Sequence, residues 1–135
     1  MLPWLLFQVV LLSGSEGLNL KSHLRSSGYI VAEVAGAGFK QLCVACGDAD
    51  VYILSKGSTF RWDTCGPHAI LRALGGGIVN YNKAIDVDKS QEESELNYSE
   101  AEGQISGPLH CNHDGLIAYR DSSLLHELIQ ILRHL

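Results

Sequence analysis

The sequence predicts an α/β fold, a layered sandwich in which helices cover a sheet. Short apolar runs alternate with amphipathic segments along most of the chain, as strands and helices do in layered α/β proteins. Turns rich in glycine separate several of these segments. The composition agrees, because 46% of the 135 residues are hydrophobic and 19% are charged. Such a chain can form one domain with a real core, and it is neither a coiled coil nor wholly disordered.

The first half of the chain provides three strands and two helices. Residues 7–12 form an apolar run that predicts a buried strand, and residues 18–26 predict a short helix that a glycine ends. A second strand is expected at 29–34, a helix at 39–46 and a third strand at 50–54. The apolar residues of the helix at 39–46 share one face, and we expect that face to be buried: Phe39, Leu42, Cys43 and Cys46.

The second half continues the alternation. A helix is expected at about 64–74, where a run of three glycines ends it. Further strands are expected at 78–79 and 115–119. Asp121 then caps a last helix. This helix has an apolar stripe formed by Leu124, Leu125, Leu128, Ile129, Leu132 and Leu135.

The alternation stops in an acidic segment. Residues 82–103 carry seven acidic and two basic side chains, so this segment alone has the net charge of −5 and the rest of the chain is neutral. A polar, acidic composition without apolar periodicity is typical of a solvated segment. We therefore expect an acidic, flexible loop at about 82–112.

The distribution of charge excludes several classes of partner. Lysine and arginine occur singly and form no basic stripe, which disfavours nucleic-acid binding. The apolar run at 1–12 imitates a signal peptide, but no basic residue precedes Lys21 and the run is too short to span a bilayer. The four cysteines are too sparse for a disulfide scaffold. We expect a cytoplasmic protein that binds no nucleic acid and does not insert into a membrane.

Two strand-to-helix turns carry candidate ligand-binding residues. Ser15 and Glu16 follow the first strand, where they can either hydrogen-bond to ligand hydroxyls or cap the next helix. Gly36, Ala37 and Lys40 follow the second strand, where helical N–H groups and a lysine charge can receive a phosphate. Glycines also occur at such turns for backbone reasons alone. If the strands are parallel, both turns lie at the carboxyl edge of the sheet, where open α/β sheets bind ligands.

Asp63 lies at the start of the helix expected at 64–74. Its carboxylate can cap the helix by accepting N–H groups of the first turn, which contributes about 1 kcal/mol. Held at a rigid junction, it can instead provide an oxygen ligand for Mg²⁺, although one carboxylate does not make a metal site. Zinc is disfavoured, because the cysteines of the helix at 39–46 lie on its apolar face and the Cys/His cluster at 110–113 adjoins the acidic loop.

Three sequence stretches also carry a family resemblance: 36–40 (GAGFK), 47–52 (GDADVY) and 62–77 (WDTCGPHAILRALGGG). They resemble the carboxyl-terminal half of the inositol monophosphatase family of lithium-sensitive, Mg²⁺-dependent phosphatases. The resemblance implies a layered helix-sheet sandwich of which residues 1–135 form the carboxyl-terminal portion. It also implies hydrolysis of phosphomonoesters by a water molecule that Mg²⁺ ions activate.

The resemblance assigns roles to the candidate residues. Asp63 matches a metal-ligand aspartate, and Gly17 stands where similar members tend to have a lysine. The positions that match the lining of the inositol phosphate pocket are Ser15, Glu16, Gly36, Ala37 and Lys40. The sequence of residues 65–79 and 115–120 is most similar to that of family members that act on inositol polyphosphates. This resemblance implies a small-molecule substrate such as inositol 1,4-bisphosphate.

The resemblance also shows what the chain does not contain. Nothing matches the family's amino-terminal acidic loop or its Asp-Pro-Ile/Leu-Asp-Gly/Ser-Thr motif, so three carboxylates and the water-orienting threonine are missing. No catalytic residue is identified, and we expect no hydrolysis by this chain alone. Two alternatives remain open: an enzyme similar to the related 3′(2′),5′-bisphosphate nucleotidases, and a non-catalytic fragment. An unpaired sheet edge would also favour self-association.

Overall fold

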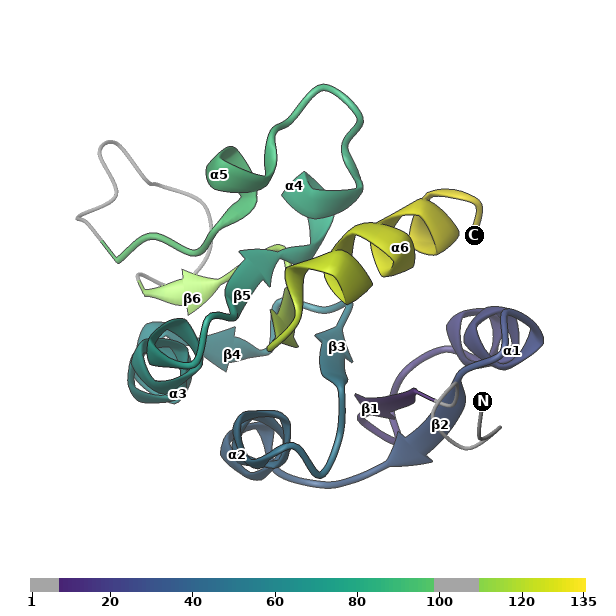
Figure 1. Cartoon of the computed structure of the whole chain (residues 1–135), viewed down its shortest axis with the longest axis horizontal. Helices are drawn as coiled ribbons and strands as arrows, with labels where there is room; N and C mark the ends of the chain where they lie inside the picture. The colour runs from purple at the N-terminus through teal and green to yellow at the C-terminus, as the bar shows by residue number, and fades with distance from the viewer. Residues whose placement is uncertain (1–7, 99–109) are drawn as a thin grey trace.

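The computed structural model describes residues 8–98 and 110–135 and confirms the α/β fold class (Figure 1). Five strands form the main sheet, in the order β2-β1-β3-β7-β5, and two more form a small second sheet. The elements in chain order are β1 (Val9–Leu12), α1 (Leu18–Ser26), β2 (Ile30–Glu33), α2 (Ala37–Cys46), β3 (Val51–Leu54), β4 (Thr59–Phe60), α3 (Arg61–Ala73), β5 (Gly77–Asn80), α4 (Tyr81–Ile85), α5 (Gln91–Ser94), β6 (Cys111–Asn112), β7 (Leu116–Tyr119) and α6 (Ser122–Arg133).

The strands of the main sheet are of mixed direction. β1 is parallel to both β2 and β3, with Val10 opposite Val31 on one side and Val51 on the other. β7 is antiparallel to β3 and to β5, so β5 runs in the same direction as the first three strands. One edge of the sheet therefore holds the carboxyl ends of β1, β2, β3 and β5. This is the arrangement expected if the turns after the first two strands share a binding site.

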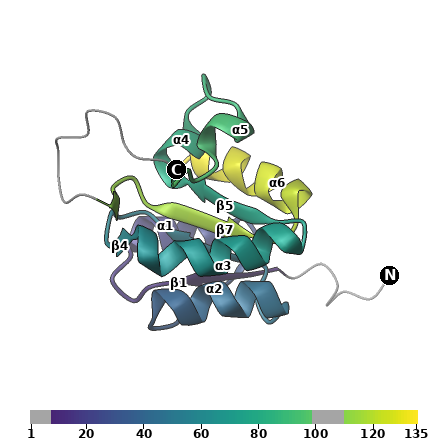
Figure 2. The same ribbon diagram turned by 90° about the vertical axis from the view of Figure 1, so that its left-hand side faces the viewer.

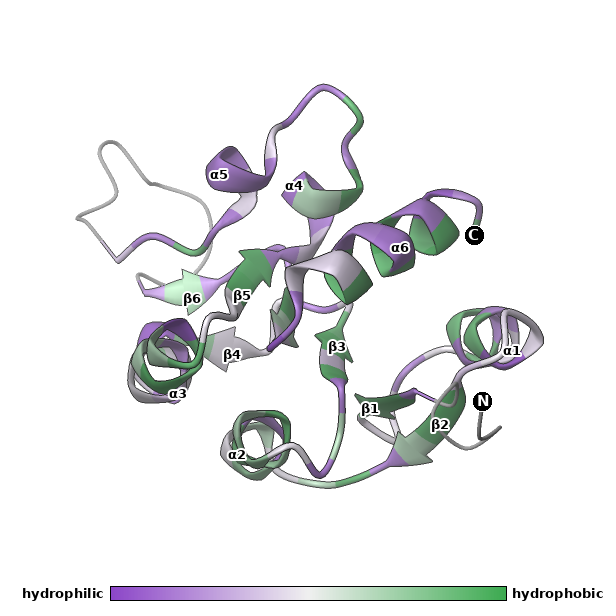
Figure 3. Ribbon diagram, viewed as in Figure 1, coloured by the Kyte–Doolittle hydropathy of each residue, from purple (hydrophilic) through white to green (hydrophobic). Residues whose placement is uncertain are grey.

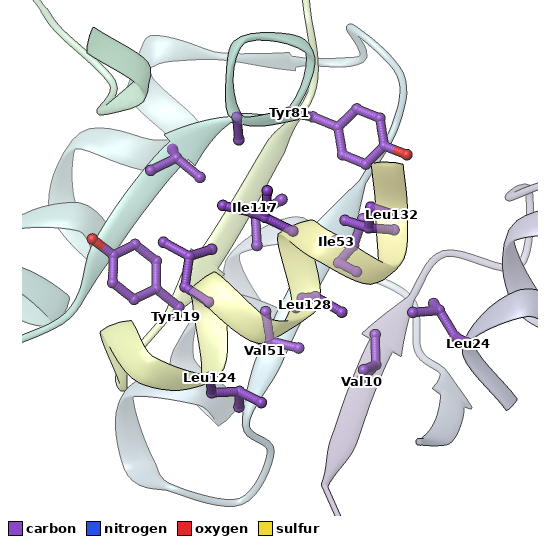
Figure 4. Packing of buried hydrophobic residues seen from close by; sticks show 14 of the residues in the cluster. Val10, Leu24, Val51, Ile53, Tyr81, Ile117, Tyr119, Leu124, Leu128 and Leu132 are labelled. Atoms are coloured by element: carbon purple, nitrogen blue, oxygen red, sulfur yellow. The ribbon is translucent and has the colours of Figure 1, made fainter. Parts of the chain in front are cut away.

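Helices cover both faces of the sheet. Alternate side chains of a strand point to opposite faces. Val10 and Ile53 therefore pack in the core beneath α1 and α6, whereas Leu11 and Tyr52 pack in a second core beneath α2 and α3. Figure 4 shows the first core, with Leu124, Leu128 and Leu132 of α6 directed toward the strands. In Figure 2, α2 and α3 lie side by side over the other face.

Most expected elements are present with small changes of boundary. The helix expected at 18–26 has those bounds. The last helix buries its apolar stripe but ends at Arg133, so Leu135 lies beyond it and is exposed. α3 begins at Arg61, three residues earlier than expected. The strand expected at 7–12 is confirmed over Val9–Leu12, and its first residue lies outside the described part of the chain.

The prediction for the buried face of α2 was wrong. Phe39 and Leu42 are exposed, and the buried residues are Lys40, Gln41, Val44 and Ala45. Two stripes of similar width run along this helix, and hydropathy alone favours the wrong one. Burial of Lys40 is tolerated because its ammonium group donates a hydrogen bond to the carbonyl of Val34 at 2.6 Å.

The acidic segment is not one continuous loop, and the expectation of a loop at 82–112 was wrong for part of it. α4 and α5 are short helices within the segment, and Glu95 forms an isolated bridge to β5. The N–H of Leu96 donates to the carbonyl of Ile78 at 2.9 Å. The edge strand β5 thus offers backbone groups that pair with this segment, a partner that composition does not reveal. Residues 99–109 lie outside the described residues.

The opposite edge of the sheet is formed by β2. Among residues 8–98 and 110–135, β2 pairs only with β1, so its outer side has no strand partner there. Self-association through this edge stays a prediction. Within the same residues, no helix combines the length and apolar character needed to cross a bilayer.

Candidate functional site

The turn that follows β1 is held by residues that follow β3. Both carboxylate oxygens of Glu16 accept hydrogen bonds from Ser55, one from its N–H at 2.8 Å and one from its hydroxyl at 2.5 Å. Nζ of Lys56 donates to the carbonyl of Ser15 at 2.6 Å. Glu16 is buried, whereas Ser15 is exposed. Glu16 therefore shapes the turn, and Ser15 is one of the turn residues exposed to solvent.

The turn that follows β2 leads directly into α2. Gly36 precedes the helix with φ +91°, a conformation that L side chains rarely adopt, and Ala37 begins the helix. Lys40 is 3% exposed, and its Nζ lies 5.0 Å from the centre of the Tyr52 ring. Burial lowers the pKa of Lys40. The charge of Lys40 thus lies beneath the turn, and direct contact with a phosphate stays a prediction.

Asp63 is the third residue of α3, not its cap. Its Oδ2 accepts the N–H of Phe60, the residue before the helix, at 2.9 Å. β6 supports this junction from the other side, because Nδ2 of Asn112 donates to the hydroxyls of Thr59 at 3.1 Å and Thr64 at 3.3 Å. Asp63 therefore does not cap the helix from its first turn as an N-cap. Its carboxylate instead forms a capping-box contact from the third helical position back to Phe60.

A buried glutamine ties this junction to α2. Pro67 lies inside α3 and has no N–H to donate to the carbonyl of Asp63, four residues earlier. Nε2 of Gln41 donates to that carbonyl at 3.1 Å and to the carbonyl of Ala37 at 3.0 Å. Gln41 is fully buried, and its Oε1 has no partner among the described residues. The first turn of α3 and the first turn of α2 are thus connected by one side chain.

The electrostatics of Tyr52 reflect two of the predicted site residues. Burial, together with the negative charges of Glu16 and Asp63, raises the pKa of Tyr52 to about 12. Both carboxylates therefore act on one phenol at the carboxyl end of β3. Ser55 was not among the site residues predicted from the sequence, although a polar residue directly after a buried strand is a signal for this edge. Gln41 was not predicted either, because hydropathy gives no signal for it.

The structure gives Asp63 no companion ligands. Among residues 8–98 and 110–135, no three His, Cys, Asp or Glu side chains gather closely enough to hold a metal ion. Asp63 is of the type that Mg²⁺ prefers, a carboxylate at a rigid junction. One such ligand does not fit the octahedral shell of Mg²⁺ by itself, so further ligands would have to come from elsewhere.

A second polar cluster joins α3 to the acidic segment. His68 is buried, with Nε2 at 2.8 Å from Oε1 of Glu95 and Nδ1 at 2.8 Å from the hydroxyl of Tyr98. Glu95 also accepts hydrogen bonds from Arg72 at 3.3 Å and from the hydroxyl of Tyr119 at 3.2 Å. Burial raises the pKa of Glu95, but the hydrogen bonds from His68 and Arg72 outweigh it and leave the pKa below its ordinary value. The cluster holds the segment after α5 against α3.

Comparison with known proteins identifies relatives with larger chains. The chain is 40% identical over 131 residues to inositol polyphosphate 1-phosphatase from Bos taurus and 43% identical over 118 residues to the protein of that name from Mus musculus. These matches cover 93% and 84% of this chain but 33% and 30% of the relatives. This chain therefore spans about a third of the length of the curated relatives that it matches.

The fold comparison gives the same result at lower sequence identity. The inositol monophosphatase structure from Anabaena (Nostoc) sp. PCC 7120 superimposes with a TM-score of 0.61 at 16% identity, covering 96% of this chain and 43% of that one. The family model described as "Inositol monophosphatase family" matches residues 12–128. That match includes the turns after β1 and β2 and Asp63. The chain belongs to the inositol monophosphatase family.

Proposed function

We propose that this chain provides part of the substrate pocket and one metal ligand of a cytoplasmic, Mg²⁺-dependent phosphatase that removes the 1-phosphate of inositol 1,4-bisphosphate. The observation that carries the proposal is the parallel arrangement of β1, β2 and β3, which brings the turns at Ser15 and Gly36 to the same sheet edge. The names of the relatives from cattle and mouse support the reaction class.

The residues of this chain would act mainly by binding and orienting the substrate. The first N–H groups of α2, beginning at Ala37, form a partial positive charge that favours a phosphate group. The exposed hydroxyl of Ser15 would contact a hydroxyl of the inositol ring. Because Glu16 and Lys56 fix the Ser15 turn, this contact would need little rearrangement.

The metal would add chemistry that these side chains do not supply. Bound Mg²⁺ ions lower the pKa of a water molecule and neutralise charge on the leaving oxygen. Asp63 would contribute one oxygen ligand, held in place through the N–H of Phe60. Since residues 8–98 and 110–135 form no group of three metal ligands, we expect the chain alone to be inactive.

The test separates binding from turnover. We expect inositol 1,4-bisphosphate, titrated into ¹⁵N-labelled chain, to shift the amide signals of residues 13–17 and 36–38. Ser15→Ala should weaken this binding, whereas Ser22→Ala, at an exposed position of α1, should not. Adenosine 3′,5′-bisphosphate, titrated in parallel, distinguishes the nucleotidase alternative.

Two results would overturn the proposal. Shifts confined to other parts of the molecule would move the pocket away from this edge. Stronger binding of adenosine 3′,5′-bisphosphate would favour the nucleotidase reading. A separate assay of phosphate release addresses completeness: magnesium-dependent, lithium-inhibited release by the purified chain would show that it needs no further residues.

A further inference from the structure

A hollow of about 430 Å³ lies at the edge of the main sheet where β1, β3 and β5 begin. This amino edge is opposite the edge that carries the candidate functional site. The ends of α2 and α3 and the connection from β7 to α6 border the hollow. In Figure 3, parts of the connections that lead into β3 and into α6 are coloured hydrophilic. We define the amino-edge pocket by six of its lining residues: Gly47, Asp50, Leu74, Arg120, Asp121 and Leu124.

Arg120 is the basic residue of the amino-edge pocket, and two glycines leave room for it. A Cβ at Gly76 would lie 2.6 Å from the Cα of Arg120, so glycine allows the chain before β5 to approach closely. A Cβ at Gly47 would lie 3.1 Å from Nη1 of Arg120. Among residues 8–98 and 110–135, the guanidinium of Arg120 has neither an ion-pair nor a hydrogen-bond partner. Its N–H groups are therefore available to a ligand.

Two carboxylates line the same pocket, and each is held by one of its oxygens. Oδ2 of Asp50 accepts the N–H of Val9 at 2.7 Å. Oδ1 of Asp121 caps α6 by accepting the N–H of Ser123 at 2.8 Å. Within the described part of the chain, the second oxygen of each carboxylate accepts no hydrogen bond. Both side chains are thus fixed in place and can still accept a hydrogen bond from a ligand.

The charges of the amino-edge pocket favour a ligand that carries both signs. In the described residues Arg120 forms no ion pair with Asp50 or Asp121, so these charges do not neutralise one another directly. The carbonyl ends of α2 and α3 add negative partial charge on this side of the sheet. A simple anion would meet two carboxylates, and a simple cation would meet a guanidinium. A zwitterion gives each group a partner of opposite charge.

We propose that the amino-edge pocket binds a free α-amino acid as its zwitterion. The ligand carboxylate binds the guanidinium of Arg120, whose planar N–H groups match a carboxylate. The ligand ammonium group binds Asp50 and Asp121. Leu74, which is 46% exposed, and Leu124 provide apolar contacts for a side chain such as that of leucine. An amino acid inside a polypeptide has neither charge, so the geometry favours the free molecule. This inference does not rest on the proposed function.

The experiment compares L-leucine with two analogues that each lack one of its charges. Isocaproate lacks the ammonium group, and isoamylamine lacks the carboxylate. Each compound would be titrated separately into the ¹⁵N-labelled chain. We expect L-leucine to shift the amide signals of residues 47–50 and 120–122 and to leave those of residues 13–17 unchanged. Each analogue should bind roughly tenfold more weakly, because it leaves one set of charged partners unused.

Two variants test the two kinds of charge in the pocket. Arg120→Gln should weaken the binding of L-leucine roughly tenfold, whereas Arg25→Gln, at an exposed position of α1, should leave it unchanged. Asp121→Asn keeps an oxygen that can cap α6 but removes the negative charge. It should therefore weaken the binding of L-leucine and strengthen that of isocaproate. Circular dichroism verifies that each variant is folded, and the two variants keep the test valid if one of them unfolds.

Three results would overturn the proposal. L-Leucine at its solubility limit that shifts no amide signal of the amino-edge pocket would exclude the site. Equal affinity of the three compounds would show that the pocket does not distinguish their charges. Unchanged binding of L-leucine in Arg120→Gln would remove the partner assigned to its carboxylate. If inositol 1,4-bisphosphate fails to bind at residues 13–17 and 36–38 while L-leucine binds as expected, the proposed function is refuted and this inference stands.

Discussion

The link from Gln41 to Asp63 can be tested by a double-mutant cycle. Gln41→Leu replaces the amide by an apolar side chain of similar size and removes its hydrogen bonds to the carbonyls of Asp63 and Ala37. Pro67 has no N–H that could replace the bond to Asp63. A lost hydrogen bond that leaves a partly buried carbonyl unpaired costs about 1–3 kcal/mol. We expect the lower end, because the substitution also removes Oε1 of Gln41, which is buried without a partner. For a domain of this size the melting temperature should fall by roughly 4 °C.

The second arm of the cycle restores the missing donor. In Pro67→Ala, the new N–H can donate to the carbonyl of Asp63 within α3. Gln41→Leu should then cost about 1 kcal/mol less than it does in the unmodified chain. Urea denaturation of the four proteins measures this difference, with Gln130→Leu at an exposed position of α6 as the control. An equal cost of Gln41→Leu in both backgrounds would refute the hydrogen-bond explanation.

Three further predictions concern other parts of the structure. Glu95→Gln should destabilise the fold by about 1–3 kcal/mol at neutral pH, since it removes the charged carboxylate that is hydrogen-bonded to His68 and Arg72. Because the pKa of Glu95 is lowered in the folded state, its contribution to stability is present above the ordinary carboxyl pKa and is lost in acid. The urea midpoints of the variant and the unmodified chain should therefore converge in acid. A difference between the two midpoints that stays constant with pH would contradict this. Ultraviolet titration should show a tyrosine with a pKa of about 12 that disappears in Tyr52→Phe, and an unchanged titration curve would contradict the assignment. Gly36→Ala should destabilise the fold by about 1–2 kcal/mol because φ at Gly36 is +91°. Gly38→Ala, inside α2 with open space around it, should be neutral or stabilising. Thermal melts that rank the two variants in the opposite order would refute the strain at Gly36.

The sequence predicted well those features that depend on local pattern. The helix Leu18–Ser26 and the apolar stripe of α6 follow from periodicity, and the glycine-rich turns marked where strands end. The shared edge of β1, β2 and β3 followed once the strands were assumed parallel. Each of these signals lies within a few neighbouring residues, so it can be read before any tertiary contact is known.

The features that the sequence did not predict depend on distant partners. The buried stripe of α2 contains Lys40, and only the carbonyl of Val34 and the ring of Tyr52 make its burial acceptable. The acidic segment was expected to be solvated, yet Glu95 is surrounded by donors that include His68 and Arg72. Hydropathy assigns a cost to each buried charge whether or not a partner exists. It therefore predicted that Lys40 and Glu95 would be exposed, and both predictions were wrong.

The contacts between Ser55, Lys56 and the turn after β1 have a consequence for ligand recognition. These hydrogen bonds connect the turn after β1 to the residues that follow β3, and Glu16 accepts two of them. Much of the conformational freedom that a flexible turn would lose on meeting a ligand is already lost when the chain folds. Ser15 therefore stands on a preorganised platform, and a ligand that reaches it would meet one defined geometry instead of selecting one from many.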